Sequence, residues 1–219
     1  MKTNRLEKFR LAQRDFFNDQ AKEWDREETP EKLEALDRIF SRLRLPLDGK
    51  ILDVGCGTGI LVPILKKMSH GRASIIELDH ARQMVLQNRN RWIARKRKVV
   101  WINADAHQLP LSKESVNAII CFAVYPHFQN KELALREFHR ILKHNGFLLI
   151  LHLMSSERLN VFHRKAGEEV RGDRLEPVEK LAEKVARLGF SLCQTREQDD
   201  LYLLLGKKVP LPGRSDPVI

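Results

Sequence analysis

The chain has 219 residues, of which 42% are hydrophobic and 31% charged, and its formal net charge is +10. These values are typical of a single folded domain with a substantial core, and they exclude a chain that stays disordered. No apolar run approaches the ~18 residues of a membrane span, and the first residues lack the apolar centre of a signal peptide. The three cysteines, Cys56, Cys121 and Cys193, are widely spaced. This argues against a disulfide framework or a zinc knuckle, so we expect a reducing, cytoplasmic setting.

The N-terminal residues 1–45 are predicted to form a helical cover. Within them, Phe17, Ala21 and Trp24 fall on one helical stripe among charged residues. A segment this polar would not fold alone, so we expect the stripe to lie on another part of the chain. Thr29-Pro30-Glu31 is a good helix start, with Thr29 as the N-cap, and the helix it opens continues to Pro46.

From residue 50 onward, strands and helices alternate along the chain. The expected strands are 50–54, 73–78, 99–103, 116–121 and 147–153, and the expected helices are 59–68, 81–95 and 130–143, with His144-Asn145-Gly146 as the stop of the last helix. Helices near 156–170 and at 177–188 precede strands 191–196 and 200–207, which are close enough to form an antiparallel hairpin. Short apolar strands suit a parallel sheet covered on both faces. We predict a Rossmann-like, doubly wound α/β fold with a seven-stranded, mostly parallel sheet and an antiparallel C-terminal hairpin strand.

The whole of residues 1–208 is expected to be one domain. Its parts are the helical cover, the α/β core 50–153, an insertion at 154–175, and a C-terminal helix and hairpin at 176–208. The tail 209–219 has three prolines and a glycine and is predicted to be disordered.

The segment Ile51–Ile60, ILDVGCGTGI, places three glycines between a strand and a helix. Gly55, Gly57 and Gly59 allow the backbone to turn sharply and to approach a ligand, and the helix that follows points free N–H groups at it. The G-x-G-x-G spacing differs from that of dinucleotide enzymes and of phosphate loops. With Asp53 before the first glycine, the segment resembles motif I of the class I S-adenosylmethionine (SAM)-dependent methyltransferases. The alternative is a strand-to-helix turn without a ligand.

Two acidic positions after the next strands extend this resemblance. Asp79 matches the family acid that accepts hydrogen bonds from the ribose hydroxyls, with Glu77 as the alternative, and Met84 matches the apolar residue under the adenine. The run Asn103–Pro110 is similar to the signature in which an Asp accepts from the adenine amino group. Asp105 and the backbone N–H of Ala106 hold the matching positions; taken alone, Asp105 would be a turn cap.

The block from Cys121 to Gly146 and the opening Phe16–Asp25 resemble the ubiquinone/menaquinone C-methyltransferase group, and the likeness covers roughly residues 14–154. In that group the N-terminal segment folds over SAM, which would explain the aromatic stripe. The resemblance implies SAM as cofactor and the following contacts: Asp53, Gly55, Cys56, Gly57, Thr58, Gly59, Asp79, His80, Met84, Asp105, Ala106, Phe122, Phe17 and Trp24. It also implies that the insertion 154–175 lies on the acceptor side.

Three histidines stand where a general base would be useful. His127 follows the fourth strand, His152 ends the fifth, and His163 lies in the next helical segment. Each is a candidate base or substrate contact, or else a polar residue of the cleft wall or surface. No H-x-x-x-H or carboxylate spacing supports a metal site, and none is expected. Arg158 and Arg164 could hold an anionic acceptor or simply face water.

The leading interpretation is a SAM-dependent methyltransferase that acts on a small molecule. The alternative is an RNA or protein methyltransferase that uses the basic region 89–98, which contains Arg89, Arg91, Arg95, Lys96, Arg97 and Lys98. The same cluster could instead be a solvated helix end. A SAM-binding protein without transferase activity is the third possibility.

Overall fold

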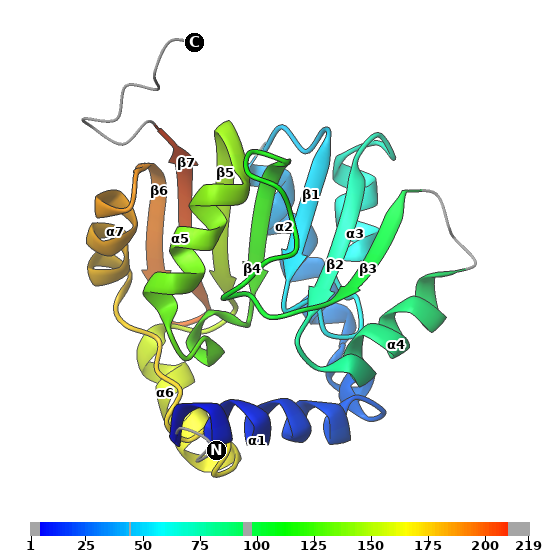
Figure 1. Ribbon diagram of the computed structural model, residues 1–219, viewed down its shortest axis with the longest axis vertical. Helices are drawn as coiled ribbons and strands as arrows, with labels where there is room; N and C mark the ends of the chain where they lie inside the picture. The colour runs from blue at the N-terminus through cyan, green and yellow to red at the C-terminus, as the bar shows by residue number, and fades with distance from the viewer. Residues whose placement is uncertain (1–4, 44, 94–97, 210–219) are drawn as a thin grey trace.

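A seven-stranded sheet in the order β3-β2-β1-β4-β5-β7-β6 forms the centre of the protein. The computed structural model describes residues 5–43, 45–93 and 98–209 (Figure 1). The strands are β1 (Lys50–Val54), β2 (Ser74–Asp79), β3 (Val99–Asn103), β4 (Val116–Phe122), β5 (Leu142–His152), β6 (Phe190–Gln198) and β7 (Leu201–Lys208). Strands β1 to β5 pair in parallel, whereas β7 pairs antiparallel with β5 and β6. The predicted fold class is confirmed.

Helices cover both faces of this sheet. They are α1 (Arg5–Gln20), η1 (Trp24–Glu27), α2 (Pro30–Leu43), α3 (Val62–Met68), α4 (Arg82–Trp92), η3 (Tyr125–His127), α5 (Lys131–Ile141), α6 (Ser156–Ala166) and α7 (Val178–Arg187). In the view of Figure 1, α5 and α7 lie in front of the sheet and α2 and α3 lie behind it. Among the described helices, none has the length and apolar character needed to cross a bilayer.

The alternation of side chains along the strands divides the core into two layers. Leu52 packs with Phe138 of α5 in one layer. Its neighbour Ile51 packs with Phe40 of α2 and Leu65 of α3 in the other. Each layer is fully buried at these positions, which explains why the strands read as continuous apolar runs rather than as alternating ones.

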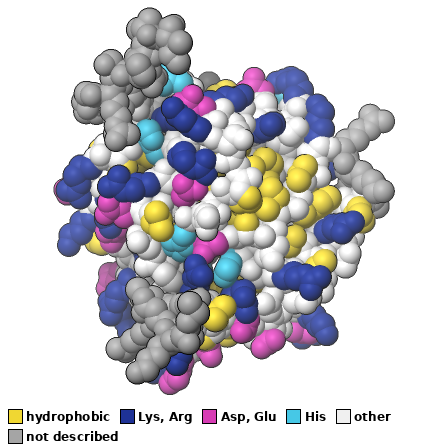
Figure 2. All heavy atoms as spheres, viewed as in Figure 1, with side chains coloured by type: hydrophobic (Ala, Val, Ile, Leu, Met, Phe, Trp, Pro, Cys, Tyr) yellow, Lys and Arg dark blue, Asp and Glu magenta, His cyan; other side chains and the backbone are white. Residues whose placement is uncertain are grey.

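One part of the front face lacks a helical cover. Residues 104–115, between β3 and β4, form turns and irregular backbone, and Val100 on β3 is 52% exposed. Figure 2 shows apolar side chains gathered on this side of the molecule.

The prediction that His144-Asn145-Gly146 ends the helix expected at 130–143 was wrong. Helix α5 ends at Ile141, and His144-Asn145-Gly146 lies within β5, which begins at Leu142. Leu142 already pairs with Val116, and the register then shifts before regular pairing resumes at Phe147. Asn145 adopts a φ of 61° inside this irregularity. Asparagine occupies this left-handed backbone conformation more readily than most other residues that have a Cβ. The turn residues therefore mark a distorted strand rather than a helix end.

Other boundaries differ by a few residues. Helix α3 begins at Val62 rather than at 59, because residues 57–61 form the turns of the glycine loop. Helix α6 ends at Ala166 rather than near 170. The predicted disorder of 209–219 concerns residues that, except for Val209, lie outside the described ranges; the Val209 N–H donates to the Gly189 carbonyl.

Helix α1 crosses the edge of the sheet at which the parallel strands end (Figure 1). Ligands of doubly wound sheets bind at this edge. The Gln83 N–H donates to the Asn18 side chain, which ties the C-terminal part of α1 to α4. The predicted helical cover therefore lies over the region that the glycine motif also reaches.

Candidate active site

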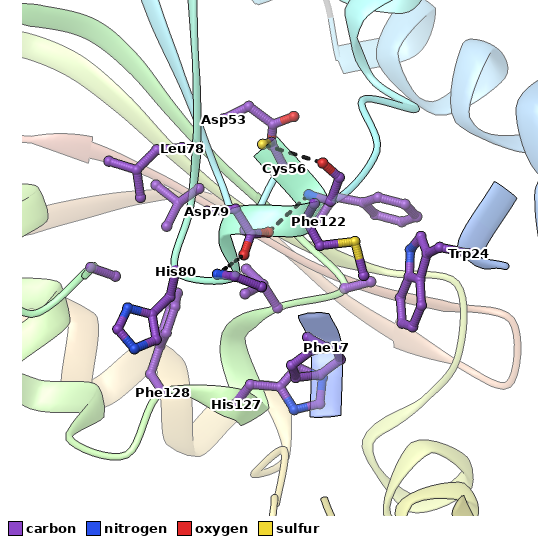
Figure 3. A pocket seen from close by; sticks show the side chains of 18 of the residues that line it. Phe17, Trp24, Asp53, Cys56, Leu78, Asp79, His80, Phe122, His127 and Phe128 are labelled. Carbon is purple, nitrogen blue, oxygen red and sulfur yellow. Dashed lines mark hydrogen bonds between the residues drawn. The ribbon is translucent and has the colours of Figure 1, made fainter. Parts of the chain in front are cut away.

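One cavity of about 320 Å³ lies between α1 and the carboxyl ends of the central strands. Its wall includes the glycine loop, the ends of β2, β4 and β5, the turn after β3, and residues of α1 and α6. Figure 3 shows side chains from these separate segments directed toward a common space. The predicted cofactor residues that line it are Phe17, Trp24, Asp53, Gly55, Cys56, Gly57, Thr58, Asp79, His80, Met84, Asp105, Ala106 and Phe122.

The three glycines of the loop have different tasks, although all have positive φ. A Cβ on Gly55 would stand 2.2 Å from Val124, and one on Gly59 would stand 2.7 Å from Asn88, so both positions are closed by the protein itself. A Cβ on Gly57 would meet only Trp24, at 3.5 Å. Gly57 therefore leaves its backbone open to the cavity. Gly59 is the one predicted cofactor residue that does not line it.

Asp79 closes the base of the glycine loop. Its carboxylate accepts hydrogen bonds from the Gly57 N–H at 3.0 Å and the Ala81 N–H at 2.8 Å. Burial raises the pKa of the Asp79 carboxyl to about 6, although these backbone hydrogen bonds oppose the shift. The side chain thus holds the loop and still faces the cavity (Figure 3).

Glu77, the alternative to Asp79, does not line the cavity and is fully buried. Its carboxylate accepts a hydrogen bond of 2.7 Å from Asn88 of α4, and Asn88 in turn accepts one from the Trp101 indole. Glu77 therefore belongs to a network behind the loop.

Asp53 is a buried carboxyl of the cavity wall, and its Oδ2 has no hydrogen-bond partner in the described part of the chain. Burial raises its pKa well above the ordinary range, and the neighbouring carboxyls Glu77 and Asp79 raise it further. Three acidic groups thus crowd around the glycine loop. A cation bound there would favour their ionised forms.

Asp105 lies after β3 in a dense set of contacts. One carboxylate oxygen is 2.6 Å from the Arg10 guanidinium of α1, and the other is 2.5 Å from Nδ1 of His107 and accepts from the His107 N–H. Burial would raise the pKa of Asp105, but the hydrogen bonds from His107 outweigh it and lower the pKa to about 2. Asp105 is therefore a carboxylate at neutral pH.

The aromatic stripe of the N-terminal segment covers this space, as the sequence predicted. Phe17, Trp24 and Ala21 pack with Met84 and Ala81 of the α4 start. The Phe17 and Trp24 rings meet edge to face with centroids 5.8 Å apart. Thr58 of the glycine loop donates to Glu28, which follows η1. These contacts fix the N-terminal cover over the glycine loop.

All three predicted histidines line the same cavity. His127 and His163 have ring centroids 5.0 Å apart. His152 is buried and its Nε2 has no hydrogen-bond partner among the described residues. Burial lowers the pKa of His152 to about 3, with smaller contributions from the other two imidazoles, so this ring is neutral. Burial likewise lowers the pKa of His163.

Two residues of this region had no sequence signal. Asp173, in the loop between α6 and α7, has a carboxylate oxygen 2.6 Å from Nδ1 of His127, and Gln13 of α1 donates to the same oxygen at 2.8 Å. Neither residue belongs to a recognisable motif. Only the packing of the insertion against α1 brings them to the histidines.

The arginines proposed for an anionic acceptor lie elsewhere. Arg158 donates to the Asp199 carbonyl on the exposed side of α6, and neither Arg158 nor Arg164 lines the cavity. In the described ranges, no group of three or more His, Cys, Asp or Glu side chains is arranged to hold a metal ion.

Comparison with known proteins agrees with the fold and the loop. Residues 52–150 match a family described as "Methyltransferase domain". The solved structure of a SAM-dependent methyltransferase from Aquifex aeolicus superposes with a TM-score of 0.65 at 17% identity, covering 84% of this chain and 100% of that one. A putative sarcosine dimethylglycine methyltransferase from Galdieria sulphuraria gives a TM-score of 0.67 at 13% identity, covering 80% and 86%. The chain therefore has the fold of these methyltransferases, and its residues 52–150 match the methyltransferase domain family.

Curated relatives are similar over the same region. The demethylmenaquinone methyltransferase of Thermotoga maritima is 35% identical over 107 residues, which are 48% of this chain and 44% of that protein. The malonyl-[acyl-carrier protein] O-methyltransferase of Laribacter hongkongensis is 29% identical over 125 residues, or 53% and 42%. The matched part thus spans less than half of the length of these relatives.

Proposed function

We propose that the protein is a methyltransferase that transfers a methyl group from SAM to a small organic acceptor. The observation that carries this proposal is that one continuous cavity joins the glycine loop and its acidic groups to a region of histidine and apolar side chains. We call the part lined by His127, His152, Met154, Leu159, Phe162 and His163 the histidine end.

The residues around the glycine loop fit SAM. SAM carries an ammonium and a sulfonium, and the unpartnered Oδ2 of Asp53 is a buried acceptor suited to a cation. The open backbone at Gly57 leaves room for close approach. Asp79 and Asp105, at the ends of β2 and β3, are the carboxylates we assign to the ribose hydroxyls and the adenine amino group. We assign Met84 to the apolar surface under the adenine, and Phe17 and Trp24 to the cover over SAM.

When bound, SAM supplies a methyl group on a sulfonium whose departure leaves a neutral thioether. The protein therefore has no leaving group to protonate, and its contributions are alignment and exclusion of water. Helix α1 supports both, because it contacts the cavity from the Asp105 side through Arg10 to the Asp173 side through Gln13. The histidines at the far end are the candidates for contact with the acceptor.

A small acceptor is favoured by the walls of the histidine end. Beside the three imidazoles they consist of apolar side chains, Met154 after β5 and Leu159 and Phe162 of α6, under the cover of α1. Two of the curated relatives are named demethylmenaquinone methyltransferases, after a small-molecule acceptor. The alternative of an RNA or protein acceptor depends on the basic region 89–98. There Arg91 is paired with Asp25 and Glu28, and Arg95, Lys96 and Arg97 lie outside the described residues.

Calorimetric titration with SAM tests the cofactor site. Gly57→Ala places a Cβ in the open space of the loop, and we expect at least a tenfold loss of affinity, about 1.4 kcal/mol. Gly71→Ala is the matched control, because Gly71 also has positive φ but has open space around it in the turn after α3. Equal SAM affinity in both variants would refute the site.

Transfer of a labelled methyl group to cell extracts tests the acceptor class. The extract is separated into dialysable metabolites, RNA and protein before assay. We expect the label in the metabolite fraction. Label confined to RNA or protein would establish the alternative, and SAM binding without transfer to any fraction would support a protein that only binds SAM.

A further inference from the structure

Asp173 is the centre of the polar contacts at the histidine end. Its side chain is 4% exposed, and its Oδ2 is 2.6 Å from Nδ1 of His127. The same oxygen accepts a hydrogen bond from Gln13. The backbone carbonyl of Asp173 is 3.0 Å from Nδ1 of His163. One residue of the insertion therefore contacts two imidazoles and helix α1.

These contacts determine which nitrogen of each ring is basic. A carboxylate and a carbonyl oxygen only accept hydrogen bonds, so Nδ1 of His127 and of His163 must carry the proton in each contact. In a neutral imidazole the lone pair is then on Nε2. A carboxylate at Nδ1 also stabilises the imidazolium that forms when Nε2 takes a proton.

His127 lies between helix α1 of the N-terminal cover and helix α6 of the insertion. Its ring lies against Phe17 of α1, with centroids 5.1 Å apart, and against His163 of α6. Figure 3 shows the Phe17 and His127 rings side by side at the cavity. The charged or titratable groups that face His127 are Asp173, His163 of α6, His152 of β5 and Asp79 of β2. Asp173 is the one in hydrogen-bond contact.

Among the residues that the structure describes, none gives the histidine end a fixed positive charge that an acceptor could contact. The basic side chains that line the cavity are Arg10, Arg14 and Lys32, which belong to α1 and α2. Arg10 is paired with Asp105 and Arg14 with Asp15. The insertion's Arg158 and Arg164 do not line the cavity. An acceptor with a permanent negative charge would therefore lack a partner, whereas a neutral one matches the walls.

We propose that His127, positioned by Asp173, is the general base for a neutral acceptor that carries an ionisable O–H, of the phenol or enol class. This inference rests on the proposed methyltransferase function and names the substrate class of the same site. The acceptor's O–H bond breaks and its proton moves to Nε2 of His127. The oxygen forms the bond to the methyl carbon, and the electron pair of the broken methyl–sulfur bond stays on sulfur. The products are the methyl ether, a neutral thioether and the His127 imidazolium, which returns its proton to water. A thiol would need less help, since it ionises more readily.

The base can be tested without any acceptor. Nitrogen-15 NMR of the free protein, recorded at a pH where the His127 ring is neutral, should show His127 as the tautomer protonated on Nδ1. Asp173→Asn should change the His127 signals and leave SAM affinity within about twofold, because Asp173 does not line the cavity. A neutral His127 ring protonated on Nε2 instead of Nδ1 in the wild-type protein would overturn the assignment.

The acceptor class is tested with a panel of phenols of graded acidity, with thiol and amine probes beside them. We expect His127→Gln to reduce turnover of a weakly acidic phenol about 100-fold, the contribution of a general base. The same variant should lose far less with 4-nitrophenol at a pH where this probe is already ionised. His139→Gln is the matched control, since His139 packs on Phe190 outside the cavity.

The positioning role of Asp173 predicts a distinct pattern. Asp173→Asn should lower kcat on the weak phenol and flatten the acid limb of its pH–rate profile, and Asp173→Glu should restore part of both. An equal loss on ionised and un-ionised phenols would overturn the base. Transfer only to thiols or amines, or to no O–H probe while SAM still binds, would overturn the acceptor class. Failure of the wild-type protein to bind SAM would instead refute the proposed function.

Discussion

The buried carboxyl of Glu77 gives a stability prediction that can be worked out from the structure. Burial raises the pKa of this carboxyl from 4.5 to about 7; the Asn88 hydrogen bond opposes the shift and the nearby Asp79 adds to it. The folded protein therefore binds the Glu77 proton more tightly than the unfolded chain does. The resulting stability is present below the unfolded pKa and is lost as the pH rises through the folded pKa.

The size of this effect follows from the shift itself. At 1.36 kcal/mol per unit, the full loss is about 3 kcal/mol, of which about 2–3 kcal/mol falls between pH 5 and pH 8. Glu77→Gln removes the titration and keeps an oxygen that can accept from Asn88. Its new amide N–H groups need partners, which costs a similar amount at both pH values. That cost cancels when the two pH values are compared.

The assay is urea unfolding of wild type and variant at pH 5 and pH 8. We expect the free energy of unfolding of Glu77→Gln, relative to wild type, to rise by about 2–3 kcal/mol from pH 5 to pH 8. Glu183→Gln, at an exposed position of α7, should show no such change. If the difference between Glu77→Gln and wild type is the same at both pH values, the ionised form of Glu77 carries no burial cost and the reasoning fails.

Three further outcomes follow from the site. Burial raises the pKa of Asp79 to about 6, so binding of a cation should release protons. Calorimetry in buffers of different ionisation enthalpy should detect this release, and titrations at several pH values should show SAM affinity increasing from pH 5 to pH 8. Trp24→Phe should remove the fluorescence change caused by SAM and weaken binding several-fold; an unchanged signal would mean that Trp24 does not contact the ligand. Gly55→Ala should lower the free energy of unfolding by about 1–3 kcal/mol, because the new Cβ overlaps Val124 at positive φ; thermal melting of this variant beside Gly71→Ala checks the overlap.

The sequence was sufficient for the sheet and for most of the cavity around the glycine loop. Short apolar strands and the order of motifs placed Asp53, Asp79 and Asp105 at the ends of successive strands, because parallel strands deliver their ends to one edge. The choice between Glu77 and Asp79 needed tertiary structure. Both belong to one strand, and it is Asn88 of α4 that binds Glu77 behind the loop.

The histidine end was only partly predictable. His127 and His152 follow strands, so their place could be inferred. Asp173 lies in a loop without a local pattern, and its partner Gln13 is 160 residues away in sequence. The strand start at Leu142 was missed because the turn-forming Asn145-Gly146 pair is accommodated by a register shift within β5. Such features depend on long-range packing, which periodicity does not encode.

The contacts of helix α1 have a consequence for the order of events in a catalytic cycle. Arg10 binds Asp105, Phe17 packs on His127, and Gln13 binds Asp173. One helix therefore contacts both ends of the cavity, and a movement of that helix would break all three contacts together. We expect both reactants to be bound before the helix closes, and the helix to open again before the thioether product is exchanged for a fresh methyl donor.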